Sequence, residues 1–146
     1  MNWSSDMLSV ILATVFGAVV GLERELSGKA AGLRTNILIC LGAAVFTILS
    51  RYMAANQDSL TRIASGVVTG IGFLGAGAII QDRGGVHGMT TAATIWVVSA
   101  IGMACGARYY ALAILATLIA LAVLLVLKIA ERPFDHHMKN KPNHLN

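Results

Sequence analysis

The chain has 146 residues, of which 56% are hydrophobic, and its mean hydropathy is +0.72. This hydrophobic content exceeds the roughly 45–50% of soluble domains, so it excludes an ordinary soluble protein and indicates one that crosses the lipid bilayer several times. The net charge of +4 does not indicate nucleic-acid binding, because the basic residues lie singly between apolar runs, as they do beside membrane spans. Cys40 and Cys105 lie within apolar runs, which predicts buried free thiols.

Five apolar runs predict an all-α membrane fold. The expected spans are residues 7–22, 33–49, 63–80, 90–104 and 109–130, which make one transmembrane domain over 1–130. Some runs are shorter than the roughly 20 residues that cross a bilayer, so the helices are expected to extend into flanking polar residues. Residues 131–146 are polar and contain two prolines, and they predict a disordered cytoplasmic tail.

The basic residues predict the orientation of the chain, because lysine and arginine are retained on the cytoplasmic side of a membrane. If the N-terminus is outside, eight of the eleven basic residues fall in inside segments. The three in outside segments are Arg51, Arg62 and Arg108. We therefore predict an N-outside, C-inside topology.

The first turn, residues 21–36, is the most charged stretch of the chain. Its ionisable residues are Glu23, Arg24, Glu25, Lys29 and Arg34. Carboxylates near bilayer depth are costly and tend to be paired, hydrated or functional. A solvated loop with local ion pairs is the alternative, and topology or ion pairing accounts for the three basic residues.

A stripe of small residues runs along the first span, where Ala13, Gly17, Gly21 and Glu25 recur every four residues. The stripe predicts close helix packing at Gly17 and Gly21. Because Glu25 continues it, we expect this side chain to point toward the packed interior. Asn36 lies just inside the second span, where burial of its amide would require hydrogen-bond partners.

The third span is rich in glycine. Gly66, Gly70 and Gly77 share one helix face, while Gly72 and Gly75 lie on another, so we expect neighbours to pack on both sides and the span to be central. The fifth span has no glycine and is expected at the periphery, facing lipid.

Residues 70–75 also fit the Gly-x-Gly-x-x-Gly pattern of dinucleotide binding, but here the pattern lies inside an apolar span and no acidic residue follows about 20 positions later. A phosphate loop and an ATPase phosphorylation motif are absent from the sequence, so we do not expect an enzyme.

The second turn and the start of the fourth span offer polar side chains: Asp82, Arg83, His87, Thr90, Thr91 and Thr94. Threonines here often cap a helix or bond to its preceding turn. Alternatively, they could line a hydrated cytoplasmic cavity with Asn36 and the two glutamates. Such oxygen ligands suit Mg²⁺, for which Glu25 and Asp82 are candidate ligands, and no other cofactor is expected.

The pattern of glycine and threonine residues in the first turn recurs 56 residues later. Gly21, Gly28, Gly32 and Thr35 align with Gly77, Gly84, Gly88 and Thr91. Chance coincidence in a glycine-rich chain is the alternative. A duplication predicts two helical hairpins in parallel repeat, with both turns at the cytoplasmic face.

Several of these stretches together resemble the MgtC/SapB family of bacterial inner-membrane proteins. They are Gly-Leu-Glu-Arg-Glu at 21–25, Gly-Lys-Ala-Ala-Gly-Leu-Arg-Thr-Asn at 28–36, Leu-Gly-Ala-Ala at 41–44, Gly-Ile-Gly-Phe-Leu-Gly-Ala-Gly at 70–77 and Gly-Met-Thr-Thr-Ala-Ala-Thr-Ile-Trp at 88–96. The resemblance implies a multi-pass plasma-membrane protein associated with magnesium limitation and, in intracellular pathogens, with survival in the host. Many relatives continue into a small soluble domain, whereas sixteen residues follow Ala130 here, so we expect the membrane module alone.

Residues and resemblance together leave several functions open. One is a transport or channel-like module for a cation, with a cytoplasmic vestibule formed by the two turns. Another is a non-transporting regulator that binds another membrane protein, such as the ATP synthase. Apart from the lipid bilayer, the expected partners are a membrane protein of this kind or further copies of the chain in a homo-oligomer. A third is an assembly that responds to membrane or ionic stress without a specific ligand.

Overall fold

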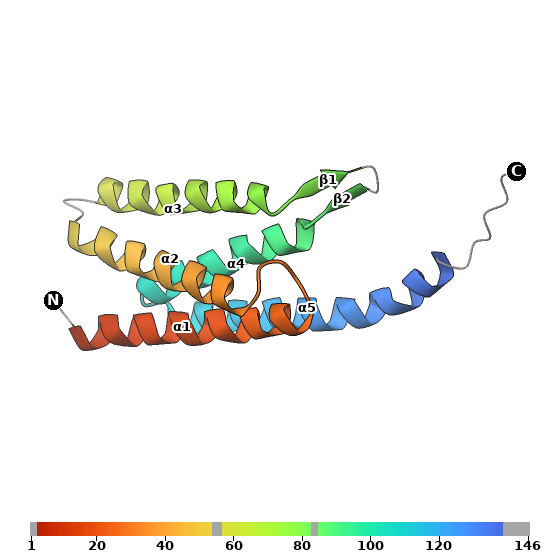
Figure 1. The fold of residues 1–146 in the computed structure, drawn as a ribbon. Helices are drawn as coiled ribbons and strands as arrows, with labels where there is room; N and C mark the ends of the chain where they lie inside the picture. The colour runs from red at the N-terminus through yellow and green to blue at the C-terminus, as the bar shows by residue number, and fades with distance from the viewer. Residues whose placement is uncertain (1–2, 54–56, 83–84, 139–146) are drawn as a thin grey trace, which may run out of the picture.

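The computed structural model describes residues 3–53, 57–82 and 85–138, without the side chains at 57–60, 63, 82 and 127–138. The described chain forms five helices and one two-stranded hairpin (Figure 1). Their bounds are α1 Trp3–Leu26, α2 Leu33–Met53, α3 Gln57–Gly77, β1 Ile80–Asp82, β2 Gly85–His87, α4 Met89–Gly106 and α5 Tyr110–Met138. The predicted all-α fold of five helices is confirmed.

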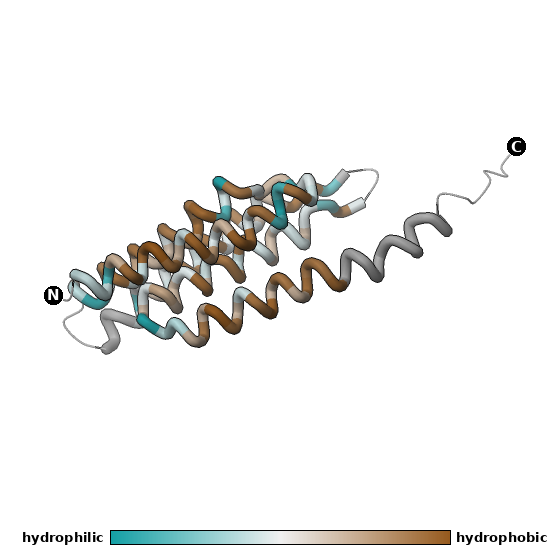
Figure 2. The backbone as a smooth tube through the Cα atoms, turned by 90° about the horizontal axis from the view of Figure 1, so that it is seen from below, coloured by the Kyte–Doolittle hydropathy of each residue, from teal (hydrophilic) through white to brown (hydrophobic). Residues whose placement is uncertain are grey.

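The helices carry the hydropathy pattern of membrane spans. Within the described residues, α1, α2 and α4 are long and apolar enough to cross a bilayer, and shorter apolar stretches occupy Ala64–Gly77 of α3 and Tyr110–Val126 of α5. Figure 2 shows hydrophobic residues along the helices and hydrophilic residues toward the two ends of the bundle. This distribution is that of a protein whose middle lies in hydrocarbon and whose ends meet water.

Three helices, α1, α2 and α4, surround the core at close range. A Cβ added at Gly17 would lie 2.8 Å from Cβ of Cys40, and one at Gly102 would lie 2.1 Å from the Cys40 carbonyl oxygen. The glycines therefore let the helix backbones approach, which is how helices gain contact where lipid supplies no hydrophobic drive. Cys40 and Cys105 are buried free thiols, as predicted.

The third span is not central, and that prediction is wrong for the single chain. α3 packs against α2 and α4 along one side of the bundle (Figure 1). A Cβ added at Gly66, Gly70 or Gly77 would meet nothing within 4 Å. Glycine shows that a backbone can be approached closely, but it does not show that a helix of the same chain makes the approach.

The connection between α3 and α4 is a β-hairpin that the sequence analysis did not predict. The third span was expected to reach Ile80, but α3 ends at Gly77 and Ile80 begins β1, paired antiparallel with His87. The helix stops where glycine gives way to β-branched Ile79 and Ile80, which favour extended backbone.

The fifth helix lies at the periphery, as expected. Ala113 and Thr117 are buried, while Leu115 and Leu118 are more than half exposed. α5 continues to Met138, so residues 131–138 are helical instead of belonging to a disordered tail, and residues 139–146 lie outside the description.

The first four helices form two antiparallel pairs whose connections lie at the same end of the bundle (Figure 1). The connections differ, since the first is a short turn and the second a hairpin. The aligned glycines also differ: Gly21 packs against Leu33, Gly77 is open, and Gly84 lies outside the described residues. The duplication and the N-outside orientation stay predictions.

Candidate functional site

A buried ion pair occupies the last turn of α1. The Arg24 Nε lies 2.6 Å from Glu23 Oε2, and Arg24 Nη2 lies 3.0 Å from Glu23 Oε1, so guanidinium and carboxylate meet as a fork. The Ser27 hydroxyl donates to Glu23 Oε1 at 2.6 Å. Glu23 is only 8% exposed and Arg24 only 2%. The two charges are therefore paired with each other inside the protein, so the local ion pair of the alternative interpretation is present, but it is buried instead of solvated.

Glu25 lies over the start of α2, and the expectation that it points into the packed interior is wrong. Its side chain is exposed and accepts a hydrogen bond from the Leu33 backbone N–H at 2.9 Å. The small-residue stripe of α1 extends beyond the start of α2 here. Gly21 already contacts Leu33, the first residue of α2, and Glu25 lies one helical turn farther along α1, past this end of α2. A carboxylate at a helix N-terminus is a favourable electrostatic contact.

Asn36 closes the turn between α1 and α2. Its side-chain amide is fully buried, and Nδ2 donates to the carbonyl oxygens of Ala31 at 2.7 Å and Gly32 at 2.8 Å. Its Oδ1 is buried without a hydrogen-bond partner among the described atoms. The hydrogen-bond demand expected from burial is thus met on the donor side only.

The predicted residues of the second turn lie in different surroundings. The Thr94 hydroxyl donates to the Thr90 carbonyl oxygen at 2.7 Å, which is the local helix bond that threonine often makes. Thr91 is buried and Thr90 exposed. Asp82 lies in β1 with its side chain outside the description, as is all of Arg83.

A magnesium site stays a prediction. Within the described residues, no three His, Cys, Asp or Glu side chains gather as metal ligands. The carboxylates of Glu23 and Glu25 point to different partners within the chain, the first to Arg24 and the second to Leu33. Among the side-chain oxygens of the predicted site residues, Asn36 Oδ1 is buried and accepts no hydrogen bond from any described atom.

A groove of about 1190 Å³ lies between α2, α3 and α4. Its walls include the open glycines Gly66, Gly70 and Gly77, and among the described residues the polar side chains that line it are Thr35 and Thr91. A second hollow of about 520 Å³ shares Ala30 and Thr35 with it and is also lined by Glu25 and Arg34. The apolar groove thus opens at the polar turn.

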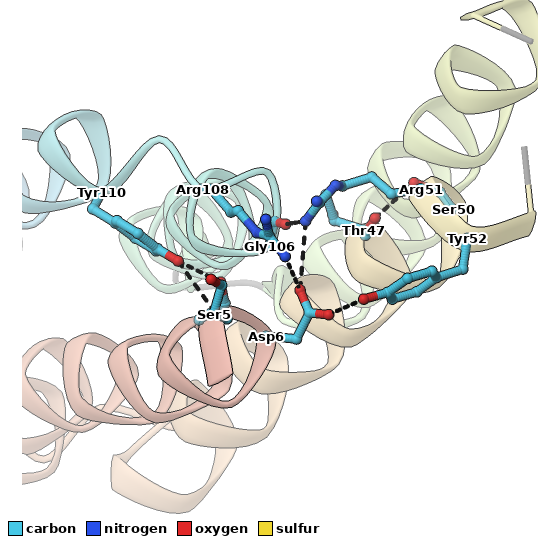
Figure 3. Close-up of polar contacts among 10 residues, drawn as sticks. Ser5, Asp6, Thr47, Ser50, Arg51, Tyr52, Gly106, Arg108 and Tyr110 are labelled. Carbon is cyan, nitrogen blue, oxygen red and sulfur yellow. Dashed lines mark hydrogen bonds and ion pairs between the residues drawn. The ribbon is translucent and has the colours of Figure 1, made fainter. Parts of the chain in front are cut away.

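The opposite end of the bundle carries a polar cluster that the sequence analysis did not single out (Figure 3). The Asp6 Oδ1 lies 2.8 Å from Arg108 Nη2 and 3.6 Å from Arg51 Nη1, and the Tyr52 hydroxyl donates to Asp6 Oδ2. Arg51 Nη1 also donates to the Gly106 carbonyl oxygen at 3.2 Å. One carboxylate therefore ties α1 to the end of α2 and to the α4–α5 connection.

Neighbouring hydroxyls extend this cluster toward α5. The Tyr110 and Ser9 hydroxyls lie 3.0 Å apart, and Tyr110 also donates to the Ser5 carbonyl oxygen at 3.3 Å. The hydrogen bond to Asp6 raises the pKa of the Arg108 guanidinium. Arg108 has φ of 67°, a left-handed conformation that glycine usually provides after a helix. The ion pair holds this residue at the turn.

Substituting Asp6 by asparagine is expected to lower the unfolding temperature of the detergent-solubilised protein. The change leaves Arg51 and Arg108 facing each other without the carboxylate between them. Thermal unfolding followed by circular dichroism measures the effect. Arg62→Gln is the control, because Arg62 is exposed. An equal unfolding temperature for Asp6→Asn and Arg62→Gln would show that the cluster does not hold the helices.

Five apolar helices with polar clusters at both ends define a helical integral membrane protein. The chain belongs to the MgtC family, whose profile matches residues 10–133, so the family resemblance read from its motifs is confirmed.

Curated relatives agree with this assignment. Over 85% of the present chain, the sequence is 44% identical to Protein MgtC of Salmonella typhimurium strain 14028s. Over 95% of the present chain, it is 42% identical to "Putative magnesium transporter YhiD" of Escherichia coli K12. It is 39% identical to an uncharacterised Synechocystis protein over 99% of its length. The chain spans only 53%, 66% and 59% of these three relatives. No solved structure matches it significantly.

Proposed function

We propose that this protein serves bacterial magnesium homeostasis as a non-enzymatic, multi-pass protein of the inner membrane, and that it regulates another membrane protein. Membership of the MgtC family supports the membrane role, and the printed name of the Escherichia coli relative supports the link to magnesium. The ATP synthase is the partner that the family resemblance implies.

One observation favours regulation over transport: the two carboxylates of the charged turn bind groups of the same chain. Glu23 is engaged by Arg24 and Ser27, and Glu25 by the N-terminus of α2. A path for Mg²⁺ needs oxygens free to hold an ion that gives up its water reluctantly. These carboxylates instead hold helix ends in place, and the large groove beside them has apolar walls.

A transport-like module with a cytoplasmic vestibule is the second candidate. Asn36 Oδ1 favours it, because a buried oxygen without a partner among the described atoms is a potential cation ligand. In that case Asn36, Glu25 and Asp82 would be the ligands to test first.

The deciding experiment combines growth at low Mg²⁺ with ion flux. A strain without its own family member receives the wild-type chain or Glu25→Gln, and purified protein is reconstituted in vesicles that contain a Mg²⁺-sensitive dye. Regulation predicts restored growth, no Mg²⁺ entry above that of empty vesicles, and co-purification of the ATP synthase at low Mg²⁺. Mg²⁺ entry with the wild type that falls with Glu25→Gln would overturn regulation in favour of transport.

A further inference from the structure

The apolar groove of α2, α3 and α4 has a polar mouth. Near the α1–α2 turn it joins the smaller hollow through Ala30 and Thr35, and Arg34 lines that hollow. Lys29 is exposed one residue before Ala30. We propose that the groove holds one acyl chain of an anionic phospholipid, whose phosphate lies at Lys29 and Arg34. This proposal does not rest on the proposed function.

The length of the groove fits one leaflet of a membrane. Its lining residues on α2 run from Thr35 to Phe46, and those on α3 from Gly66 to Gly77. At a rise of 1.5 Å per residue each wall is about 16 Å long. This is about half of the roughly 30 Å hydrocarbon core, so the groove matches a lipid chain from one leaflet, whereas a partner's transmembrane helix would cross both leaflets.

The walls of the groove suit a hydrocarbon chain. Gly66, Gly70 and Gly77 leave the surface of α3 open, and Leu38 and Phe46 of α2 are more than half exposed. An acyl chain has no polar group that these walls would leave unsatisfied. Thr35 is exposed at the end where the lipid ester groups would lie.

The charges at the mouth select an anionic headgroup. Neither Lys29 nor Arg34 belongs to an ion pair among the described residues, and both are exposed. Glu25 also lines the small hollow, where its Oε2 accepts the Leu33 N–H, and it adds one negative charge, so Lys29, Arg34 and Glu25 together give the mouth a net charge of +1. One net positive charge near a membrane surface favours anionic lipid by about fivefold, so the mouth is expected to give a preference of about fivefold.

Native mass spectrometry of the full chain in detergent tests the proposal with equimolar phosphatidylglycerol and phosphatidylcholine. Wild type is expected to retain phosphatidylglycerol about fivefold more than phosphatidylcholine. Gly70→Leu should fill the groove and lose bound lipid at least tenfold. Gly72→Leu is the matched control, since Gly72 is also an open α3 glycine but does not line the groove. Lys29→Gln with Arg34→Gln should abolish the preference while some phosphatidylcholine still binds.

Three outcomes would overturn the proposal. Equal retention of the two lipids by wild type would remove the headgroup site. Equal lipid loss in Gly70→Leu and Gly72→Leu, with circular dichroism unchanged in both, would place bound lipid outside the groove. A dimer in the wild type that Gly70→Leu alone abolishes would make a second copy the occupant. These lipid measurements are independent of Mg²⁺ flux, so they can fail or succeed whatever the flux result.

Discussion

Glu23→Gln is expected to destabilise the protein by about 3–5 kcal/mol, the usual cost of removing one partner from a buried ion pair. The substitution leaves the Arg24 guanidinium, which is 2% exposed, without its carboxylate. One guanidinium nitrogen, Nη1, already lacks a partner among the described atoms, so the remaining polar contacts cannot take up the charge. Chemical denaturation in detergent micelles, followed by circular dichroism, measures the loss.

Two variants separate this effect from a general sensitivity of the turn. Glu23→Leu with Arg24→Met removes both buried charges and is expected to recover most of the lost stability, because a buried pair can often be replaced by apolar side chains. Glu25→Gln should cost less than about 1 kcal/mol, because it removes an exposed contact with a helix terminus. If Glu23→Gln and Glu25→Gln were equally stable, the buried ion pair would not stabilise α1.

Gly102→Ala is expected to cost about 3 kcal/mol, at the upper end of the usual range for overpacking a core. The new Cβ would lie 2.1 Å from the carbonyl oxygen and 2.9 Å from the carbonyl carbon of Cys40. These are backbone atoms of α2 and cannot rotate away as a side chain would, so α2 and α4 must separate. The same denaturation experiment measures this change.

Gly42→Ala is the matched control for that prediction. Gly42 is also a helical glycine, on α2, but an added Cβ there meets nothing within 4 Å. Alanine should leave stability unchanged or raise it by up to about 1 kcal/mol through its better helix propensity. Equal stability of Gly102→Ala and Gly42→Ala would mean that α2 and α4 do not pack as closely as described.

The five-helix fold could be predicted because apolar runs between polar segments specify helices in a membrane without reference to their neighbours. The arrangement of the helices could not be read as directly. Gly17 and Gly66 both belong to small-residue faces, yet Gly17 contacts α2 and Gly66 is open. Which glycine is covered depends on neighbours that are distant in the sequence.

The candidate site shows the same limit. The charged turn itself could be predicted from its composition, but the pairing of Glu23 with Arg24 and the capping of α2 by Glu25 depend on where α1 ends and how α2 begins. In the second cluster, Asp6 contacts Tyr52, which lies 46 positions later in the sequence, and Arg108, which lies 102 positions later. The predicted topology places Asp6, Arg51 and Arg108 on the same side of the membrane. This indicates that they lie at the same end of the bundle, but it does not predict that they are in contact.

The buried thiols of Cys40 and Cys105 make the wild-type chain a convenient background for site-directed labelling. Both side chains are 0% exposed, so a maleimide reagent meets neither of them while the protein is folded. Lys29 lies in the α1–α2 connection and Thr61 near the start of α3, both at exposed positions, and these two segments are at opposite ends of the bundle (Figure 1). A cysteine introduced at either position would then be modified selectively. Labelling from each side of an intact membrane would report directly which end faces the cytoplasm, without a cysteine-free variant.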